Sequence, residues 1–179
     1  MESALRLRAV ASSDASLRAA ALNSEHVSRG ILMEVPVSVE RTEEWIQRVA
    51  SDVSRRDFCL EDAAEVLAFV GLVNIQPLHR TCELYVFTLP STRGKGFGSR
   101  ATELALDYAK IELGARKVYL YVSAPNNVAI SLYERLGFQL EGTLRAHTWH
   151  RGAFVDRLIY SRFLDDWHAN ATRLYQSLA

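Results

Sequence analysis

The spacing of apolar residues changes along the chain, and each change predicts an element. Residues 5–9 alternate apolar side chains with arginine, which indicates a strand with one buried face. The alanine-rich segment 12–24 begins with Ser and Asp, which cap helix N-termini, so we expect a helix there. Segment 38–56 places an apolar residue at every fourth position from Trp45 to Val53, which predicts a second helix.

Four strands are expected in the middle of the chain. Segments 58–61 and 66–75 predict two strands joined by a tight polar turn, and Pro77 ends the second. Segment 82–90 is a third strand, stopped by its final proline. Segment 117–122 is apolar on both faces, which is typical of a strand inside a sheet rather than at its edge.

Two helices and a hairpin are expected in the second half. One helix begins near Gly98, keeps one apolar face and ends at Gly114. Segment 126–137 carries an apolar stripe at helical spacing and predicts a short capped helix. Segments 138–149 and 153–163 predict a hairpin around an Arg-Gly turn.

The chain is organised as one unit. No internal repeat, low-complexity segment or linker interrupts its 179 residues. A chain of this length suits one domain with its own core. We therefore expect a single α/β domain over residues 1–179, with a core at about 4–165 and a C-terminal tail at 166–179.

Composition narrows the classes of partner. Apolar residues make up 49% of the chain, and 21 basic side chains balance 21 acidic ones. A chain without net charge lacks the overall positive charge that attracts nucleic acid or an anionic membrane, so we expect neither partner. Cys59 and Cys82 lie in apolar runs without metal-ligand spacing, which predicts buried free thiols and no metal site. The sequence shows neither a signal-peptide pattern nor a membrane-spanning run, which indicates a cytoplasmic protein.

The stretch STRGKGFGSRA, residues 91–101, places three glycines among basic residues between a strand and a helix. A Walker loop requires Ser or Thr after its lysine, but Gly96 follows Lys95. A dinucleotide fingerprint requires glycine where Ser99 stands, so both nucleotide-binding motifs are excluded. Glycines that expose backbone N–H groups beside a helix N-terminus still favour phosphate binding, with an ordinary solvated turn as the alternative.

A second motif, NNVAISLYERLGF at 126–138, follows the next strand. The glycine stretch fits Arg/Gln-x-x-Gly-x-Gly/Ala, and the two motifs in this order resemble the GNAT superfamily of acyl-CoA-dependent N-acetyltransferases. The chain is most similar to the branch with spermidine and ribosomal-protein N-terminal acetyltransferases, and the resemblance covers nearly its whole length. It implies a mixed central sheet of about seven strands, splayed in the middle and flanked by about four helices.

The resemblance implies acetyl-CoA as the co-substrate. The strand end at 87–89 would bind the pantetheine arm through its backbone, and the loop at 93–99 would bind the pyrophosphate. The expected cofactor-binding residues are Phe87, Thr88, Leu89, Arg93, Gly94, Lys95, Gly96, Phe97, Gly98, Ser99 and Asn126. Pro125 and Asn127 depart from the residues usual in this branch, which should shift the start of the short helix more than its chemistry.

Acetyl transfer to an amine requires an acid for the departing thiolate and a base for the ammonium. The resemblance assigns the acid to Tyr133, although its position on the apolar stripe also suits a core tyrosine. Glu83, at the start of the central strand, is the candidate base, with an exposed strand-end charge as the alternative. Further candidate bases are Glu34, His79, His147 and His150.

The acceptor is expected to be a small, cationic primary amine. Glutamates gather around the first helices, on the side that faces the acceptor in this fold, and Trp45 and Trp149 could add cation–π contacts. These glutamates are Glu25, Glu34, Glu40, Glu43 and Glu44. Nearby arginines offset them, so solvated helix faces are the alternative. A protein N-terminus as acceptor, a non-catalytic acyl-CoA-binding module and homo-oligomerisation stay open.

Overall fold

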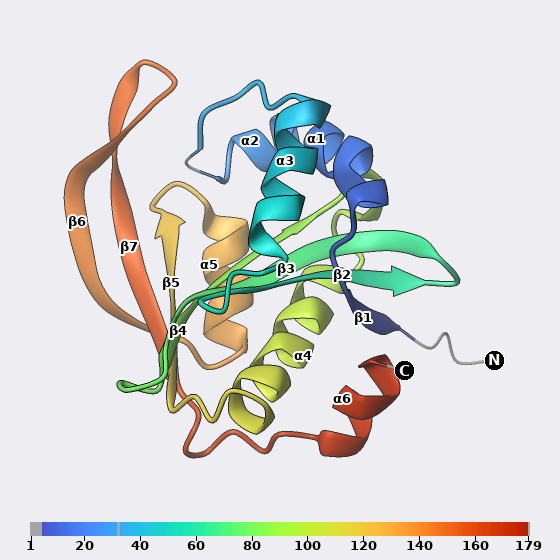
Figure 1. Ribbon diagram of the computed structural model, residues 1–179. Coiled ribbons are helices and arrows are strands. Elements are labelled where there is room, and N and C mark those ends of the chain that lie inside the picture. Colours follow the sequence, from blue (N-terminus) through green and yellow to red (C-terminus); the bar gives the residue numbers. More distant parts are fainter. Residues whose placement is uncertain (1–4, 32, 179) are drawn as a thin grey trace.

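The computed structural model describes residues 5–31 and 33–178. Within this part, seven strands form one sheet in the order β1-β2-β3-β4-β5-β7-β6 (Figure 1). The strands are β1 (Arg6–Ala9), β2 (Arg56–Asp62), β3 (Glu65–Gln76), β4 (Thr81–Thr88), β5 (Lys117–Ser123), β6 (Gln139–His150) and β7 (Ala153–Phe163). Neighbouring strands are antiparallel except β4 and β5, which are parallel. The expected mixed sheet is confirmed, with β5 inside it.

Six α-helices are present in the described part of the chain. They are α1 (Ala15–Asn23), α2 (Glu25–Ser28), α3 (Val39–Val49), α4 (Phe97–Ile111), α5 (Asn127–Arg135) and α6 (Ala171–Leu178). The expectation of about four helices missed α2 and α6. The first is a single turn whose cap, Ser24, accepts a hydrogen bond from the Val27 N–H. The second lies in the segment expected as a tail.

The helix expected over 38–56 is wrong in its second half. It ends at Val49, and Val53 is 81% exposed beyond it. The Asp52 carboxylate accepts hydrogen bonds from the Ser54 N–H at 2.8 Å and from its hydroxyl at 2.6 Å. Short polar side chains that bond to nearby backbone compete with helix formation, so this turn ends α3 and leads into β2.

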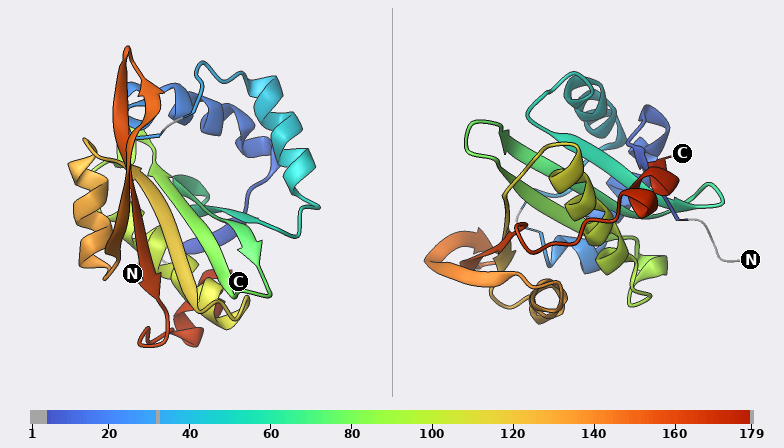
Figure 2. Two further views of the ribbon diagram at one scale, coloured as in Figure 1. Left: turned by 90° about the vertical axis from the view of Figure 1, so that its left-hand side faces the viewer. Right: turned by 90° about the horizontal axis from the view of Figure 1, so that it is seen from below.

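Helices cover both faces of the sheet (Figure 2). Alternate strand residues point to opposite faces, so one face of β3 and β4 presents Phe69 and Phe87 and the other presents Val70 and Leu84. The first pair packs in one cluster with residues of α1 and α2, and the second pair packs with α4 and α5. The sheet is therefore buried on both faces over its central strands.

The two central strands separate along their length. The ladder between β4 and β5 begins at Thr81–Lys117 and ends at Glu83–Tyr119. Beyond this point β4 continues to Thr88, paired only with β3, while β5 pairs only with β7. The sheet is therefore splayed in the middle, as expected, and both strands present backbone groups toward the gap.

The C-terminal segment packs against the rest of the domain. Leu174 of α6 is fully buried. Asp107 of α4, which has no exposed surface, accepts hydrogen bonds from Trp167 Nε1 at 2.9 Å and Arg173 Nε at 2.7 Å. These contacts bind α6 to α4, so the segment expected as a tail contributes to the core.

Two smaller expectations are also confirmed. Cys59 and Cys82 are free and buried. The hairpin of β6 and β7 turns at Arg151 and Gly152, whose φ angles of 50° and 85° suit a tight two-residue turn.

None of the described helices combines the length and apolar character needed to cross a membrane.

Candidate active site

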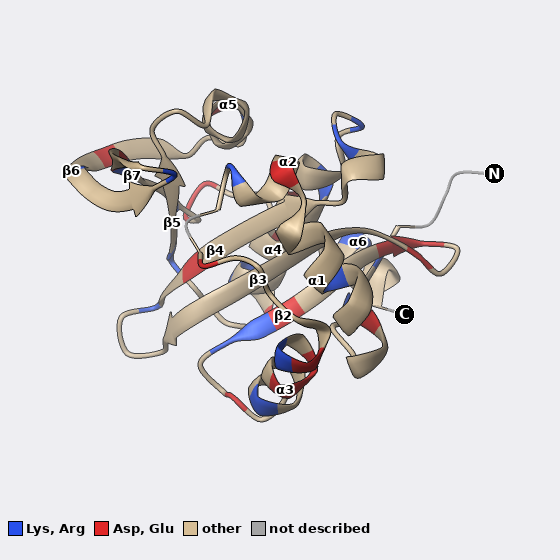
Figure 3. Ribbon diagram, turned by 90° about the horizontal axis from the view of Figure 1, so that it is seen from above, with Lys and Arg blue, Asp and Glu red and all other residues tan. Residues whose placement is uncertain are grey.

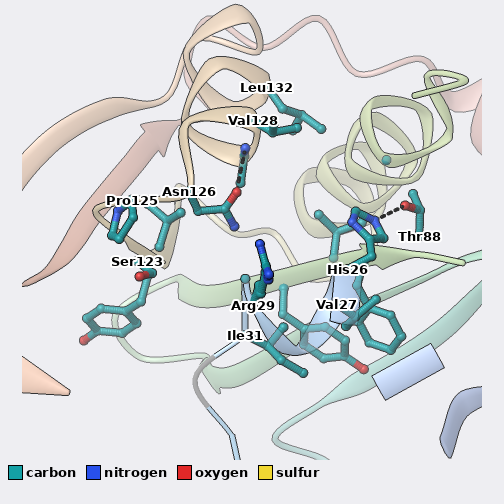
Figure 4. A pocket seen from close by; sticks show the side chains of 18 of the residues that line it. His26, Val27, Arg29, Ile31, Thr88, Ser123, Pro125, Asn126, Val128 and Leu132 are labelled. Carbon is teal, nitrogen blue, oxygen red and sulfur yellow. Dashed lines mark hydrogen bonds between the residues drawn. The ribbon is translucent and has the colours of Figure 1, made fainter. Parts of the chain in front are cut away.

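A cavity of about 940 Å³ occupies the gap where β4 and β5 separate. Its walls come from these two strands, α2, the start of α4, α5 and the β6–β7 hairpin. His26 and Arg29 on the α2 side and Asn126 on the α5 side point into the space between them (Figure 4). The unpaired edge of β4 faces this gap, which suits an extended ligand bound as an added strand.

The glycine loop leads from β4 into α4. Gly94 and Gly96 have φ angles of 75° and 84°, which glycine adopts without strain, and a Cβ on either would meet nothing within 4 Å. Backbone conformation, not lack of space, therefore requires these glycines. In the described part of the chain, the N–H groups of residues 96–99 make no hydrogen bond to another backbone group. Arg93 lines the cavity beside them. This arrangement can bind a phosphate group.

The expected cofactor-binding residues fall into three groups. Those on the cavity wall are Phe87, Thr88, Arg93, Gly98 and Asn126. Those in the adjoining loop and first turn of α4 are Gly94, Lys95, Gly96, Phe97 and Ser99. Leu89 is buried in the cluster with α1 and α2, so it can contribute only through its backbone.

The start of α5 carries the second motif. Asn126 caps the helix, since its Oδ1 accepts a hydrogen bond from the Ala129 N–H at 3.3 Å. Tyr133 lines the cavity and is only 6% exposed, with its ring centroid 5.6 Å from that of Phe138. Burial raises the pKa of Tyr133 above its ordinary value, so the hydroxyl stays protonated at neutral pH and can donate a proton.

Glu83 occupies the last pair of the β4–β5 ladder and lines the cavity at the point where the strands separate. Its carboxylate accepts a hydrogen bond from Asn74 Nδ2 at 2.6 Å. A half-buried carboxylate in this position can take a proton from a bound ammonium. Among the other candidate bases, His150 also lines the cavity, whereas Glu34, His79 and His147 are exposed and lie off its wall.

Of the residues expected on the acceptor side, Glu25 lines the cavity, whereas Glu34, Trp45 and Trp149 lie off its wall. Trp45 is covered by the guanidinium groups of Arg18 and Arg55, 4.2 and 5.0 Å from its ring centroid. Trp149 is 62% exposed and stacks edge-on against another aromatic ring of the hairpin. Glu34 lies in the exposed loop before α3. Basic and acidic residues alternate around α3 (Figure 3), so its glutamates form a mixed, solvated face.

The cavity residues that the sequence analysis did not identify include His26, Tyr85 and Arg157. Burial and the Arg93 charge lower the pKa of His26, whose Nε2 lies 3.4 Å from Thr88 Oγ1. The Arg157 guanidinium lies over a tyrosine ring of β5, 4.1 Å from its centroid. Strand alternation from Glu83 could have identified Tyr85. No local signal distinguishes the other two from ordinary surface residues.

Comparison with known proteins extends these observations. The chain matches the acetyltransferase (GNAT) family over residues 23–138. Spermidine N(1)-acetyltransferase from Vibrio cholerae is 32% identical over 157 residues, which cover 87% of this chain and 91% of that protein. The crystal structure of spermidine N-acetyltransferase from V. cholerae in complex with CoA and spermine has a TM-score of 0.84 at 30% identity, covering 89% of this chain and 95% of that one. A dodecameric structure of the V. cholerae enzyme has a TM-score of 0.78 at 29% identity, covering 89% and 94%.

The matched region contains the two separating strands, β4 and β5, together with the glycine loop and the start of α5. The likeness to the V. cholerae enzyme extends this match over most of the chain, in sequence and in three dimensions. The chain therefore belongs to the GNAT family and is an acetyl-CoA-dependent N-acetyltransferase.

Proposed function

We propose that this enzyme acetylates a primary amine of a polyamine by direct attack in a ternary complex. The separation of β4 and β5 beyond Glu83 carries the proposal, because it opens one cavity to the glycine loop, Tyr133 and Glu83 together. The polyamine is supported by the likeness to spermidine acetyltransferase and to its complex with CoA and spermine.

The residues present fit acetyl-CoA. The free N–H groups of residues 96–99 and the Arg93 side chain would hold the pyrophosphate. The edge of β4 that faces the gap, at Phe87 and Thr88, would hold the pantetheine arm, and Asn126 would contact the arm near its thioester end. Bound there, the co-substrate supplies an activated acetyl group and a thiolate leaving group.

Two side chains would move protons. An alkylammonium has a pKa of about 10.4, so the acceptor must lose a proton before its nitrogen can attack. We assign this proton to Glu83, directly or through water, and we assign protonation of the departing sulfur to Tyr133. Alignment of the two substrates in one cavity supplies a further part of the rate enhancement.

The phosphate-binding role of the loop is tested by Gly96→Asp. This change adds a negative charge beside the free N–H groups, so calorimetry should show acetyl-CoA binding weakened at least tenfold, about 1.4 kcal/mol or more. Gly96→Asn is the matched control, because asparagine has the same shape, tolerates a positive φ and carries no charge. If both variants bind acetyl-CoA as tightly as the wild type, the loop does not hold the phosphates.

The acceptor is tested with a thiol-release assay across polyamines, aminoglycosides, amino sugars and peptides with free N-termini. We expect the highest kcat/KM with spermidine or spermine. Their KM should rise with salt, because exposed charges are screened beyond about 8–10 Å at physiological ionic strength. Turnover of peptides without turnover of any small amine would contradict the proposal.

Three broader features belong to the same proposal. We take residues 1–179 as one acetyltransferase domain, since the buried core extends from Leu7 to Leu174. A cytoplasmic location is supported by two free, buried cysteines, which suit a reducing compartment. Self-association is supported by the dodecameric structure of the V. cholerae enzyme.

A further inference from the structure

Tyr85 lies beside Glu83 in the wall of the cavity. The two residues are two positions apart in β4, so their side chains leave the strand on the same face. This is the face covered by α1 and α2, because Tyr85 packs against the cluster that includes Phe87 and residues of those helices. The tyrosine ring therefore borders the site of the proposed base on the side away from α4 and its glycine loop.

The Tyr85 ring extends across β3, and its hydroxyl bonds to Asp57 of β2. Tyr85 pairs with Gly71 of β3, and Gly71 pairs with Asp57 of β2, which forms a row across three strands. The Tyr85 hydroxyl donates a hydrogen bond to Asp57 Oδ1 at 2.5 Å. A Cβ on residue 71 would clash with Tyr85 Cε1, so only glycine leaves room for the ring.

Further contacts hold the ring in one orientation. Arg55 fixes the Asp57 carboxylate with two hydrogen bonds, of 2.6 and 2.9 Å. The Arg18 guanidinium lies 5.7 Å from the Tyr85 ring centroid and donates to its hydroxyl at 3.5 Å. The Phe87 ring stacks against it at 6.2 Å with an angle of 17°. The ring surface is therefore formed before a ligand binds, which lowers the entropic cost of binding.

The wall near Tyr85 combines apolar surface with the Glu83 carboxylate. Val27 and Ile31 line the cavity from the α2 side (Figure 4), and Phe87 lines it from β4. Glu83 stands at the end of this apolar wall, where the β4–β5 ladder closes. An ammonium at Glu83 would leave a following alkyl chain against the aromatic ring, which would bury its methylene groups.

We propose that Tyr85 determines acceptor specificity: held over Gly71 by Asp57, its ring is the surface against which the alkyl chain of the acceptor lies. The preferred acceptor is then a primary amine on an unbranched alkyl chain. This inference rests on the proposed function, because it places the acceptor beside Glu83. It assigns Gly71 and Asp57 as positioning residues that act through Tyr85.

The test is a cycle of variants measured by acceptor KM, kcat and acetyl-CoA Kd, with spermidine as the first acceptor. Tyr85→Leu and Gly71→Ala should each raise the acceptor KM roughly tenfold, the scale of one lost apolar contact, and leave the acetyl-CoA Kd within about twofold. The acceptor KM of the double variant should equal that of Tyr85→Leu. Gly71 acts only by positioning the Tyr85 ring, so its replacement has no further effect once the ring is gone. Gly142→Ala is the matched control, because a Cβ there meets nothing within 4 Å.

Tyr85→Phe keeps the ring and removes only its hydrogen bond to Asp57, so it should raise KM by a smaller factor and retain kcat. Unchanged KM in Tyr85→Leu, additive losses in the double variant, or a fall in kcat alone in Tyr85→Phe would each overturn the inference. If wild-type enzyme does not turn over spermidine, the polyamine proposal fails by itself. The cycle is then measured with the amine that the wild type acetylates fastest.

Discussion

Tyr133→Phe is expected to lower kcat by about 10²-fold or more, because general acids typically contribute 10²–10⁴ to the rate. The change removes one oxygen from a ring that is 6% exposed and packed against Phe138. The packing survives, so the acetyl-CoA Kd should change by less than about twofold. A loss of this size corresponds to about 2.7 kcal/mol in the activation free energy.

Tyr160→Phe is the matched control for this experiment. Tyr160 is also buried, at 4% exposure, but its hydroxyl donates to Glu134 at 3.0 Å and it does not line the cavity. Its replacement should lower stability by about 1 kcal/mol, the value of one hydrogen bond, and leave kcat unchanged. Full turnover in Tyr133→Phe would show that Tyr133 serves packing alone.

Asp107→Ala is expected to lower the free energy of unfolding by about 3 kcal/mol, the lower end of the range for breaking a buried ion pair. The fully buried carboxylate accepts from the side chains of Trp167 and Arg173 and from the Asn170 N–H. Its removal leaves these donors without their acceptor and loosens α6 from α4. Urea unfolding should show a lower midpoint with an unchanged slope.

Asp165→Ala provides the comparison, because its pair with Arg116 is exposed, with side chains 66% and 57% accessible. Such surface pairs contribute about 0–1 kcal/mol, so the urea midpoint should barely move. Equal midpoints for the two variants would mean that α6 does not depend on Asp107.

Local sequence patterns were sufficient to predict most of the helices and strands and the glycine loop at one end of the site. The apolar stripe of α4, the alternation in β1 and the apolar run of β5 each arise within one element, so spacing alone predicts them. The same holds for the glycine loop, whose backbone angles depend on its own residues. The end of α3 was missed because a side chain at Asp52 bonds to a nearby N–H, an effect that apolar spacing does not register.

The sequence by itself therefore determined the order of the seven strands and of four of the six described α-helices, the α/β class and the motif that led to the acetyltransferase family. Only the tertiary structure decided where the β4–β5 ladder ends, and hence that Glu83 lies on the cavity while Trp45 is covered by arginines. It also decided that α6 packs against α4 through the bond between Arg173 and Asp107, and that the Tyr85 ring lies over Gly71. The physical reason is that these contacts join residues that lie far apart in the sequence, on different elements. Which of these residues meet depends on how the whole sheet and its helices pack.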